Sequence, residues 1–291
     1  MPCYHPIRVD ILRKTGVDGS RRVRDNQQVP CGNCLGCRAE QGRQWAVRMM
    51  HEAQMHDHAW FLTLTYDNDQ LPEKGTLVPE HFRSFVKSVR RDHPPGSVSY
   101  FGCGEYGDQR RRPHYHAVLY GVEFSDRYIH THRGGYPVWR SETLERYWRR
   151  GISEFSTVTF GSASYVASYV RKKVEARDNE DYYLRVDDET GELHEVEPEF
   201  ARMSLRPAIG KRWLERYWRD VYPSDHVVVD GYEAKPPRYY DKWLEKNHPE
   251  VAYEVRMNRW NPDYDDSKAK REAREANHKA RISLYAQRDT L

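Results

Sequence analysis

The sequence is 291 residues long and 31% of it is charged, with 47 Lys and Arg nearly balanced by 44 Asp and Glu. No apolar run approaches the roughly 20 residues of a membrane span, and the N-terminus lacks the apolar core of a signal peptide. The 21 Tyr and 8 Trp are too many for a disordered chain. These features exclude a membrane protein and predict a polar, folded, cytosolic one with one or two domains.

The placement of charge says more than its sum. Short basic runs interleaved with Tyr and Trp lie within residues 90–173, whereas residues 178–200 are rich in acid. Basic side chains pair with phosphates and aromatic rings stack on bases, so this pattern favours a single-stranded nucleic-acid partner. The alternative is an ordinary solvated surface.

Cysteines are concentrated at the start of the chain, where Cys3 precedes the stretch PCGNCLGC with Cys31, Cys34 and Cys37. Short, glycine-containing loops between thiolates let several sulfurs converge on one ion, so we expect a tetrahedral structural zinc site. An iron–sulfur cluster is the alternative, although the next cysteine in the chain is Cys103. A cytosolic location disfavours disulfides.

Hydrophobic periodicity predicts the elements that follow. Apolar positions at helical spacing alternate with runs rich in β-branched and aromatic residues, an order typical of an α+β fold with a mainly antiparallel sheet. In chain order we expect a helix over 38–58, a strand over 59–67, a helix over 79–93, strands over 96–107 and 113–124, a helix over 141–149, a strand over 151–160 and a helix over 161–177.

The last third of the chain has a looser pattern. An acidic, turn-rich stretch suggests a hairpin about residues 188–192. The sequence LERYWR occurs at 144–149 and again at 214–219, which indicates two short amphipathic helices rather than a repeat architecture. A proline-started helix is expected within 235–249. From residue 265 the pattern indicates a weakly anchored helix or a nucleic-acid-contacting tail.

Residues 112–121 read RPHYHAVLYG, and in a strand His114 and His116 project to the same face. Glu105 ends the preceding predicted strand, and a short hairpin would place its carboxylate opposite His114. Two imidazoles and one carboxylate suit Mg²⁺ or Mn²⁺ acting on a phosphate. The alternative is a pair of structural histidines.

A candidate nucleophile lies in the stretch YVASYVRKK, which puts Tyr165 and Tyr169 about one helical turn apart on one face, with Lys172 and Lys173 beyond them. Both tyrosines could instead pack against the sheet. Only Tyr169 has a lysine three residues on, and a cation beside a phenol favours the phenolate. Of the two, Tyr169 is therefore expected to be the more readily ionised.

Three ordered motifs, FLTLTYD, HYH and YVASYVRKK, resemble those of the HUH endonucleases, the rolling-circle replication initiators. The stretches PCGNCLGCR, GEYGDQRRRPHYHAVLYG and PRYYDKWLE look like the replication initiators of gokushovirus-type microviruses, single-stranded DNA phages. The likeness runs from about residue 1 to 246. It departs from the family pattern at Ser168, where a lysine commonly follows the first tyrosine at the third position.

The resemblance implies a ferredoxin-like HUH endonuclease core with a central antiparallel sheet flanked by helices. Its expected extent is 45–180. A Cys-rich, zinc-binding module over 1–44 is expected to pack on this core, and a mostly helical C-terminal extension over 181–291 to follow it, with the charged tail from 265.

The resemblance also implies nicking of single-stranded origin DNA by tyrosine attack, which leaves a 5′-phosphotyrosine adduct and a 3′-OH primer, followed by rejoining. Mg²⁺ or Mn²⁺ would be held by Glu105, His114 and His116, with Lys172 assisting Tyr169. Under this resemblance we expect Tyr169 to make the first cut and Tyr165 to serve mainly in termination and strand transfer. Expected DNA contacts are Arg110, Arg111, Arg112 and Lys173.

The expected setting is the host bacterial cytoplasm, with host helicase and polymerase as partners, because the sequence has no phosphate-binding G-x-x-x-x-G-K-[S/T] loop. Two rival functions remain open. One is a zinc-containing single-stranded nucleic-acid-binding protein without catalysis, and the other is a metal-dependent hydrolase that uses water.

Overall fold

The computed structural model describes residues 3–15, 21–107, 111–175, 180–187, 190–260 and 265–288. Side chains are described for 3–10, 27–107, 111–168, 181–187, 190–260 and 265–284. The chain forms two compact units, one of residues 42–258 and one that joins residues 1–41 to 259–291.

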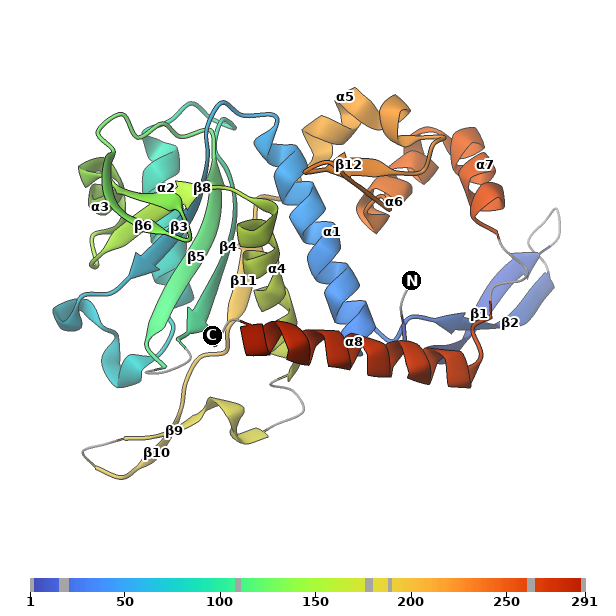
Figure 1. The fold of residues 1–291 in the computed structure, drawn as a ribbon, viewed down its shortest axis with the longest axis horizontal. Coiled ribbons are helices and arrows are strands. Elements are labelled where there is room, and N and C mark those ends of the chain that lie inside the picture. The colour runs from blue at the N-terminus through green and yellow to red at the C-terminus, as the bar shows by residue number, and fades with distance from the viewer. Residues whose placement is uncertain are drawn as a thin grey trace. The chain divides into compact units, whose positions relative to one another are not determined.

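Helices are interspersed with single strands and with groups of strands in the described chain (Figure 1). The α-helices are α1 Leu35–Ala53, α2 Pro79–Arg91, α3 Glu142–Trp148, α4 Phe160–Glu175, α5 Lys211–Val221, α6 Arg238–Asn247, α7 Pro249–Arg259 and α8 Lys268–Arg288. The strands are β1 Ile7–Thr15, β2 Arg21–Val29, β3 Ala59–Thr65, β4 Ser99–Tyr106, β5 Pro113–Tyr120, β6 Tyr128–Arg133, β7 Tyr136–Arg140, β8 Ser153–Thr157, β9 Leu184–Val186, β10 Leu193–Glu195, β11 Phe200–Met203, β12 Val227–Val229 and β13 Tyr232–Ala234. Short 3-10 helices occupy Asn68–Gln70, Glu73–Gly75 and Glu180–Tyr183.

The larger unit is built on a seven-stranded sheet with the strand order β11-β4-β5-β3-β8-β7-β6. Every pair of neighbours in it is antiparallel. β5 lies between β4 and β3, so its residues are held from both sides. The α+β class and the antiparallel central sheet expected from the sequence are confirmed.

The two faces of the sheet are covered by different helices because side chains alternate along each strand. On one face, Leu62 and Leu64 of β3 and Tyr115 of β5 pack with apolar residues of α2 and α3. On the other face, Phe101 of β4 and Val118 of β5 pack with apolar residues of α1 and α4. The even-numbered residues of β5, which include both histidines, therefore belong to the face that α4 covers.

Glycines in β4 fix which way its other side chains point. A Cβ at Gly102 would collide with the ring of Phe82 in α2, and one at Gly104 would lie 2.7 Å from the ring of Phe200. Both positions thus admit close packing on the α2 face. The residues between and after them face the other way, so Glu105 shares a face with the histidines of β5.

A third apolar cluster joins α5, α6, α7 and the β12–β13 hairpin to one side of α1. Inside it His51 of α1 is fully buried and its ring stacks on Trp213, with 3.5 Å between ring centroids. Burial lowers the pKa of His51 to about 3, so this histidine is neutral at physiological pH and serves packing.

The smaller unit contains the β1–β2 hairpin, the loop before α1 that carries Cys31 and Cys34 (the cysteine loop), and α8. The hairpin pairs in register from Ile7 with Val29 to Thr15 with Arg21. α8 contacts the N-terminal segment, where the Tyr4 hydroxyl lies 2.9 Å from Nδ1 of His278 and His5 Nε2 lies 2.9 Å from a Glu275 carboxylate oxygen. The tail expected from residue 265 therefore contains a helix, and this helix contacts the N-terminal segment at Tyr4 and His5.

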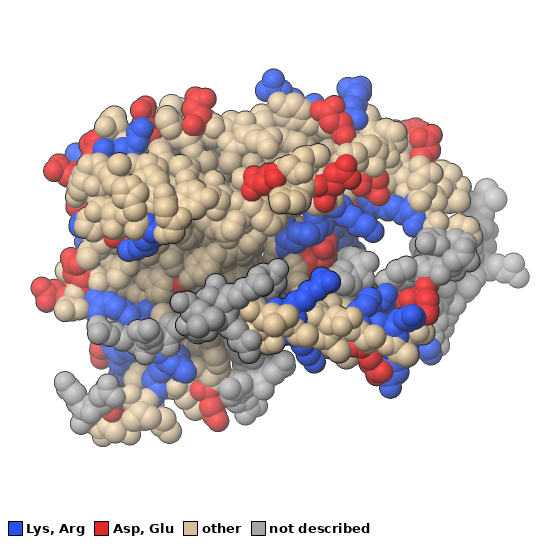
Figure 2. Space-filling view, in the orientation of Figure 1, with Lys and Arg blue, Asp and Glu red and all other residues tan. Residues whose placement is uncertain are grey.

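The molecular surface is highly charged but mixed in sign. On the face drawn in Figure 2, Lys and Arg are interspersed with Asp and Glu. This agrees with the small net charge of +3. No helix in the described part of the chain is both long enough and apolar enough to span a membrane.

Candidate functional site

Glu105, His114 and His116 meet where β4 and β5 run side by side. Glu105 is the direct cross-strand partner of His114, which is the register that the sequence predicts. Nε2 of His114 lies 2.5 Å and Nε2 of His116 3.0 Å from the same carboxylate oxygen, Oε1 of Glu105. One ligand atom from each of the three residues lies within 4.8 Å of the other two, so the group has the form of a cation site.

Neighbouring groups orient both imidazole rings. Nδ1 of His114 lies 3.1 Å from the carbonyl oxygen of Arg112, an acceptor that requires Nδ1 to carry the proton. Nδ1 of His116 lies 3.1 Å from the hydroxyl of Thr63 on β3, and the Phe61 ring stacks on the His116 ring at 5.4 Å. Such partners fix ring orientation and leave Nε2 to face a metal.

Sequence reasoning missed Thr63 and Phe61 as parts of the site. The signal that locates them is strand register, since Thr63 pairs with His116 across β3 and β5. Partners in an antiparallel pair share a face, so residues 61 and 63 must flank the histidines once β3 is placed beside β5. The sequence gives the strands but does not show which ones are neighbours.

Glu105 is 2% exposed, and its charge depends on its neighbours. Burial acts to raise its pKa, but hydrogen bonds with His114 and His116 outweigh burial and bring the pKa to about 2. The carboxylate is therefore ionised at neutral pH. Its second oxygen, Oε2, is buried without a hydrogen-bond partner among the described residues.

A tyrosine hydroxyl completes this cluster. The Tyr165 side chain of α4 is 43% exposed and its hydroxyl donates a hydrogen bond of 2.9 Å to Oε1 of Glu105. Its ring lies edge-on to His116, with 5.1 Å between centroids. Tyr169, Lys172 and Lys173 lie in the same helix, but their side chains are outside the described residues.

The predicted DNA-binding arginines follow β4 in the loop to β5. Arg110 lies outside the described residues. Arg111 is exposed at the start of the described segment. The Arg112 guanidinium donates hydrogen bonds to the Tyr66 carbonyl at 2.6 Å and to the Asn68 side chain at 2.8 Å, which holds this loop against the end of β3.

The four N-terminal cysteines converge in the smaller unit. Their sulfur atoms all lie within 4.8 Å of one another, and the sulfurs of Cys3 and Cys31 are 3.8 Å apart. Backbone N–H groups of Tyr4, Cys31 and Cys34 donate to sulfurs, each at 3.3 Å. All four cysteines are free thiols.

The thiol pKa values in this cluster are shifted in different directions. Burial acts to raise the pKa of Cys34, but hydrogen bonds from the backbone of Cys37 and Tyr4 outweigh it and bring the pKa to about 6. Burial raises the pKa of Cys3 and of Cys37. Cys34 is thus the thiolate that is already formed at neutral pH, which is the ionisation state of a metal ligand.

The larger unit is thereby an antiparallel α+β domain with a candidate divalent-cation site beside a tyrosine hydroxyl. The family model described as "Replication-associated protein ORF2/G2P" matches residues 59–174, which span β3, β4, β5 and nearly all of α4. Taken with the relatives below, this places the chain in the family of phage replication-associated proteins.

Three phage proteins are similar to the chain over most of its length. Replication-associated protein VP4 of Bdellovibrio phage phiMH2K is 33% identical over 273 residues, covering 88% of this chain and 82% of the relative. Replication-associated protein ORF2 of Spiroplasma virus 4 is 29% identical, covering 87% and 83%. Replication-associated protein ORF4 of Chlamydia phage 1 is 29% identical, covering 82% and 59%. No solved structure matches the chain.

Proposed function

We propose that this protein is a replication initiator that nicks single-stranded origin DNA through a tyrosine and later rejoins the strand. The observation that carries the proposal is the hydrogen bond of the Tyr165 hydroxyl to Oε1 of Glu105, the oxygen that both histidines face. A nucleophile and a set of cation ligands thus meet at one point. Membership in a replication-associated family supports a role on DNA.

The residues present fit a divalent cation. Oε2 of Glu105 is buried with its lone pairs unused among the described residues, and a buried carboxylate oxygen in this state favours a cation. Imidazole and carboxylate together suit Mn²⁺, and Mg²⁺ accepts such a site with water in its open positions. Bound there, the cation would supply positive charge beside the scissile phosphate.

The chain's own residues would position and perform the attack. The phenol oxygen forms a bond to phosphorus, its proton passes to water, and the bond from phosphorus to the 3′ oxygen breaks. The leaving 3′ oxygen takes a proton and becomes the primer terminus. The reverse reaction, with a new 3′-OH as nucleophile, closes the strand. The phosphotyrosine retains the phosphodiester bond energy, so cutting and joining need no nucleotide.

We propose that the four cysteines hold structural zinc. Tetrahedral bonds of about 2.3 Å put thiolate sulfurs about 3.8 Å apart, which is the separation of Cys3 and Cys31. An iron–sulfur cluster would need room for its own iron and sulfide atoms between the thiolates. Four sulfurs within 4.8 Å of one another leave no such room.

The same proposal implies a domain organisation, a set of DNA contacts and host partners. A ferredoxin-like HUH core over 45–180 would carry the chemistry, a zinc module over 1–44 would precede it, and a mostly helical extension over 181–291 would follow it. Arg110, Arg111, Arg112 and Lys173 would contact the DNA backbone, and Lys172 would assist Tyr169. Unwinding and synthesis would come from host helicase and polymerase in the bacterial cytoplasm.

The test is formation of a covalent adduct. The full-length protein is incubated with labelled single-stranded origin DNA and Mn²⁺, then denatured in SDS. We expect a protein–DNA adduct that His116→Ala abolishes while DNA binding persists, because most phosphate contacts come from Arg and Lys. Nicking without an adduct would favour the water-using hydrolase, and binding without nicking would favour the non-catalytic zinc protein.

A further inference from the structure

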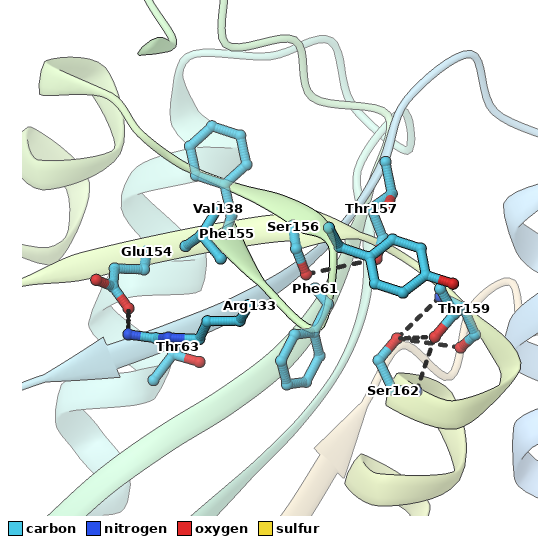
Figure 3. Close-up of a pocket in the computed structure, with 11 residues that line it drawn as sticks. Phe61, Thr63, Arg133, Val138, Glu154, Phe155, Ser156, Thr157, Thr159 and Ser162 are labelled. Atoms are coloured by element: carbon cyan, nitrogen blue, oxygen red, sulfur yellow. Dashed lines mark hydrogen bonds and ion pairs between the residues drawn. The ribbon is translucent and has the colours of Figure 1, made fainter. Parts of the chain in front are cut away.

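A cavity of about 210 Å³ lies beside the candidate cation site on the same face of the sheet (Figure 3). Its walls come from β3, β8, the tip of the β6–β7 hairpin and the start of α4. The volume is below the roughly 300–1,000 Å³ of pockets that hold drug-sized ligands. The cavity is therefore large enough for one planar ring system, such as a single purine or pyrimidine base, but not for a larger ligand.

The hairpin tip brings an aromatic ring and a guanidinium to this cavity. Gly134 and Gly135 form its two-residue turn with φ values of +56° and +83°, a conformation that favours glycine at both positions. Arg133 and Tyr136 flank the turn and are direct cross-strand partners, and both line the cavity. Tyr136 is 58% exposed, which leaves its ring accessible to a ligand.

Arg133 is held in place by an acid on the cavity wall. Its Nη2 lies 2.8 Å from a carboxylate oxygen of Glu154 on β8, and Figure 3 shows the pair on one side of the cavity. Thr159 and Ser162 stand on the opposite side. Glu154 is the cross-strand partner of Thr63 on β3, and the Thr63 hydroxyl contacts His116. The Arg133–Glu154 ion pair is therefore held next to the strand whose Thr63 orients His116.

Phe61 is the wall that the cavity and the cation site share. Its ring lines the cavity, stacks on His116 at 5.4 Å and meets Tyr165 edge-on at 6.3 Å. Glu154 on β8 is two strand positions from His116 on β5, a separation of about 10 Å. A group bound in the cavity would therefore lie close to a phosphate at the cation site.

We propose that this cavity binds one nucleobase of the single strand next to the scissile phosphate, with Tyr136 stacking on the base and Arg133 selecting guanine. The proposal rests on the nicking function proposed above. An aromatic face binds any base, whereas a positioned guanidinium donates two parallel hydrogen bonds to O6 and N7 of guanine. Glu154 engages Nη2 of Arg133 and keeps the guanidinium at the cavity wall, and the guanidinium has further N–H donors for a bidentate contact with the base.

The experiment measures base preference separately from chemistry. Each position of a single-stranded origin oligonucleotide is randomised in turn, and the full-length protein selects bound molecules without added Mg²⁺ or Mn²⁺. We expect guanine to be enriched about tenfold or more at one position. Arg133→Lys should erase that enrichment but keep overall affinity, because a lysine retains the charge without the planar fork.

Matched variants test the same hairpin away from the cavity. Arg140→Lys makes the same change at the end of β7, where Arg140 pairs with Glu145 of α3, and should leave the guanine preference intact. Tyr136→Ala should weaken binding about tenfold and Tyr136→Phe should restore it, because stacking needs only the ring. Tyr128→Ala, at an equally exposed tyrosine of β6, should have no such effect.

The outcomes separate the two proposals. Lack of any guanine enrichment in the wild type, or an enrichment that Arg133→Lys leaves unchanged, would overturn the base-binding subsite. Adduct formation by the wild type on the same oligonucleotides is measured in parallel with Mn²⁺. An adduct without Arg133-dependent enrichment overturns the subsite alone, and enrichment without an adduct overturns the nicking function alone.

Discussion

The two tyrosines of α4 lie about a helical turn apart, and the order in which they act is open to test. Lys172 favours Tyr169 for the first cut, as the sequence predicts. Tyr165 is the tyrosine of the pair whose side chain is described, and its hydroxyl lies 2.9 Å from Oε1 of Glu105. A phosphate bound at the cation site would lie beside Glu105, and the Tyr165 hydroxyl already contacts this residue. We therefore propose Tyr165 for the first cut.

On a linear origin oligonucleotide, Tyr165→Phe should lose most of the adduct seen after SDS denaturation. Tyr169→Phe should keep adduct formation but fail to release closed circles in a replication assay. The reverse pattern would restore the lysine-based order and keep the mechanism. An adduct from the double phenylalanine variant would contradict the tyrosine assignment altogether.

Thr63 acts through His116, and its role can be separated from packing. Thr63→Val keeps the shape of the side chain but removes the hydroxyl that lies 3.1 Å from Nδ1 of His116. Loss of such an outer partner typically weakens metal affinity by about 10- to 100-fold. Calorimetric titration with Mn²⁺ should show this loss.

Two further variants complete the Thr63 test. Thr63→Ser should restore affinity because it returns the hydroxyl. Thr65→Val makes the same change on the next residue of that face of β3 and should bind Mn²⁺ like the wild type. Equal loss in Thr63→Val and Thr65→Val would show that the hydroxyl of Thr63 has no special role.

Among the elements, the cysteine loop at the start of α1 carries the clearest stability prediction. Cys34→Ser removes a thiol whose pKa is lowered to about 6, and should release zinc and lower the melting temperature. Cys103→Ala, at the buried cysteine of β4, is the control and should retain its zinc. Metal analysis and thermal unfolding measure both. Normal zinc content in Cys34→Ser would mean that the cluster is not a structural zinc site.

The strongest sequence patterns predict the elements that hold the candidate site. Alternation in FLTLTYD locates β3, which buries one regular face, and helical spacing locates α4. The apolar run in PHYHAVLY locates β5, which is buried on both faces. The same spacing puts His114 and His116 on one face. Local patterns suffice for these residues because their geometry is set within a strand or between neighbours.

Elements without a buried apolar face escape such patterns. The β6 residues are mostly exposed, so β6 buries no regular apolar face. The β1–β2 hairpin is rich in charged residues, a composition that disfavours a strand prediction. β11 is four residues long and gains its place only by pairing with β4, from which it is far in sequence. Strand order and long-range register depend on tertiary packing, which no local window contains.

At the scale of the whole molecule, the two compact units should respond differently to metal removal. The four N-terminal cysteines belong to one unit, and Glu105, His114, His116 and Tyr165 all belong to the other. A zinc chelator should remove hydrogen-exchange protection from the cysteine loop and the start of α1 while the amides of β3 and β5 stay protected. Mass spectrometry of exchanged peptides gives the readout. Equal loss of protection in β5 would show that the units unfold together.

One carboxylate oxygen has an enzymological consequence. Three donors, two imidazoles and the Tyr165 hydroxyl, converge on Oε1 of Glu105. A cation that binds this carboxylate through both of its oxygens, the unpartnered Oε2 and Oε1, would displace these donors from Oε1. Loading the ion and uncoupling the phenol from the carboxylate are then a single event. The kinetics should follow a compulsory order in which the cation adds first, and the nucleophile is unmasked only after the ion that activates its target is in place.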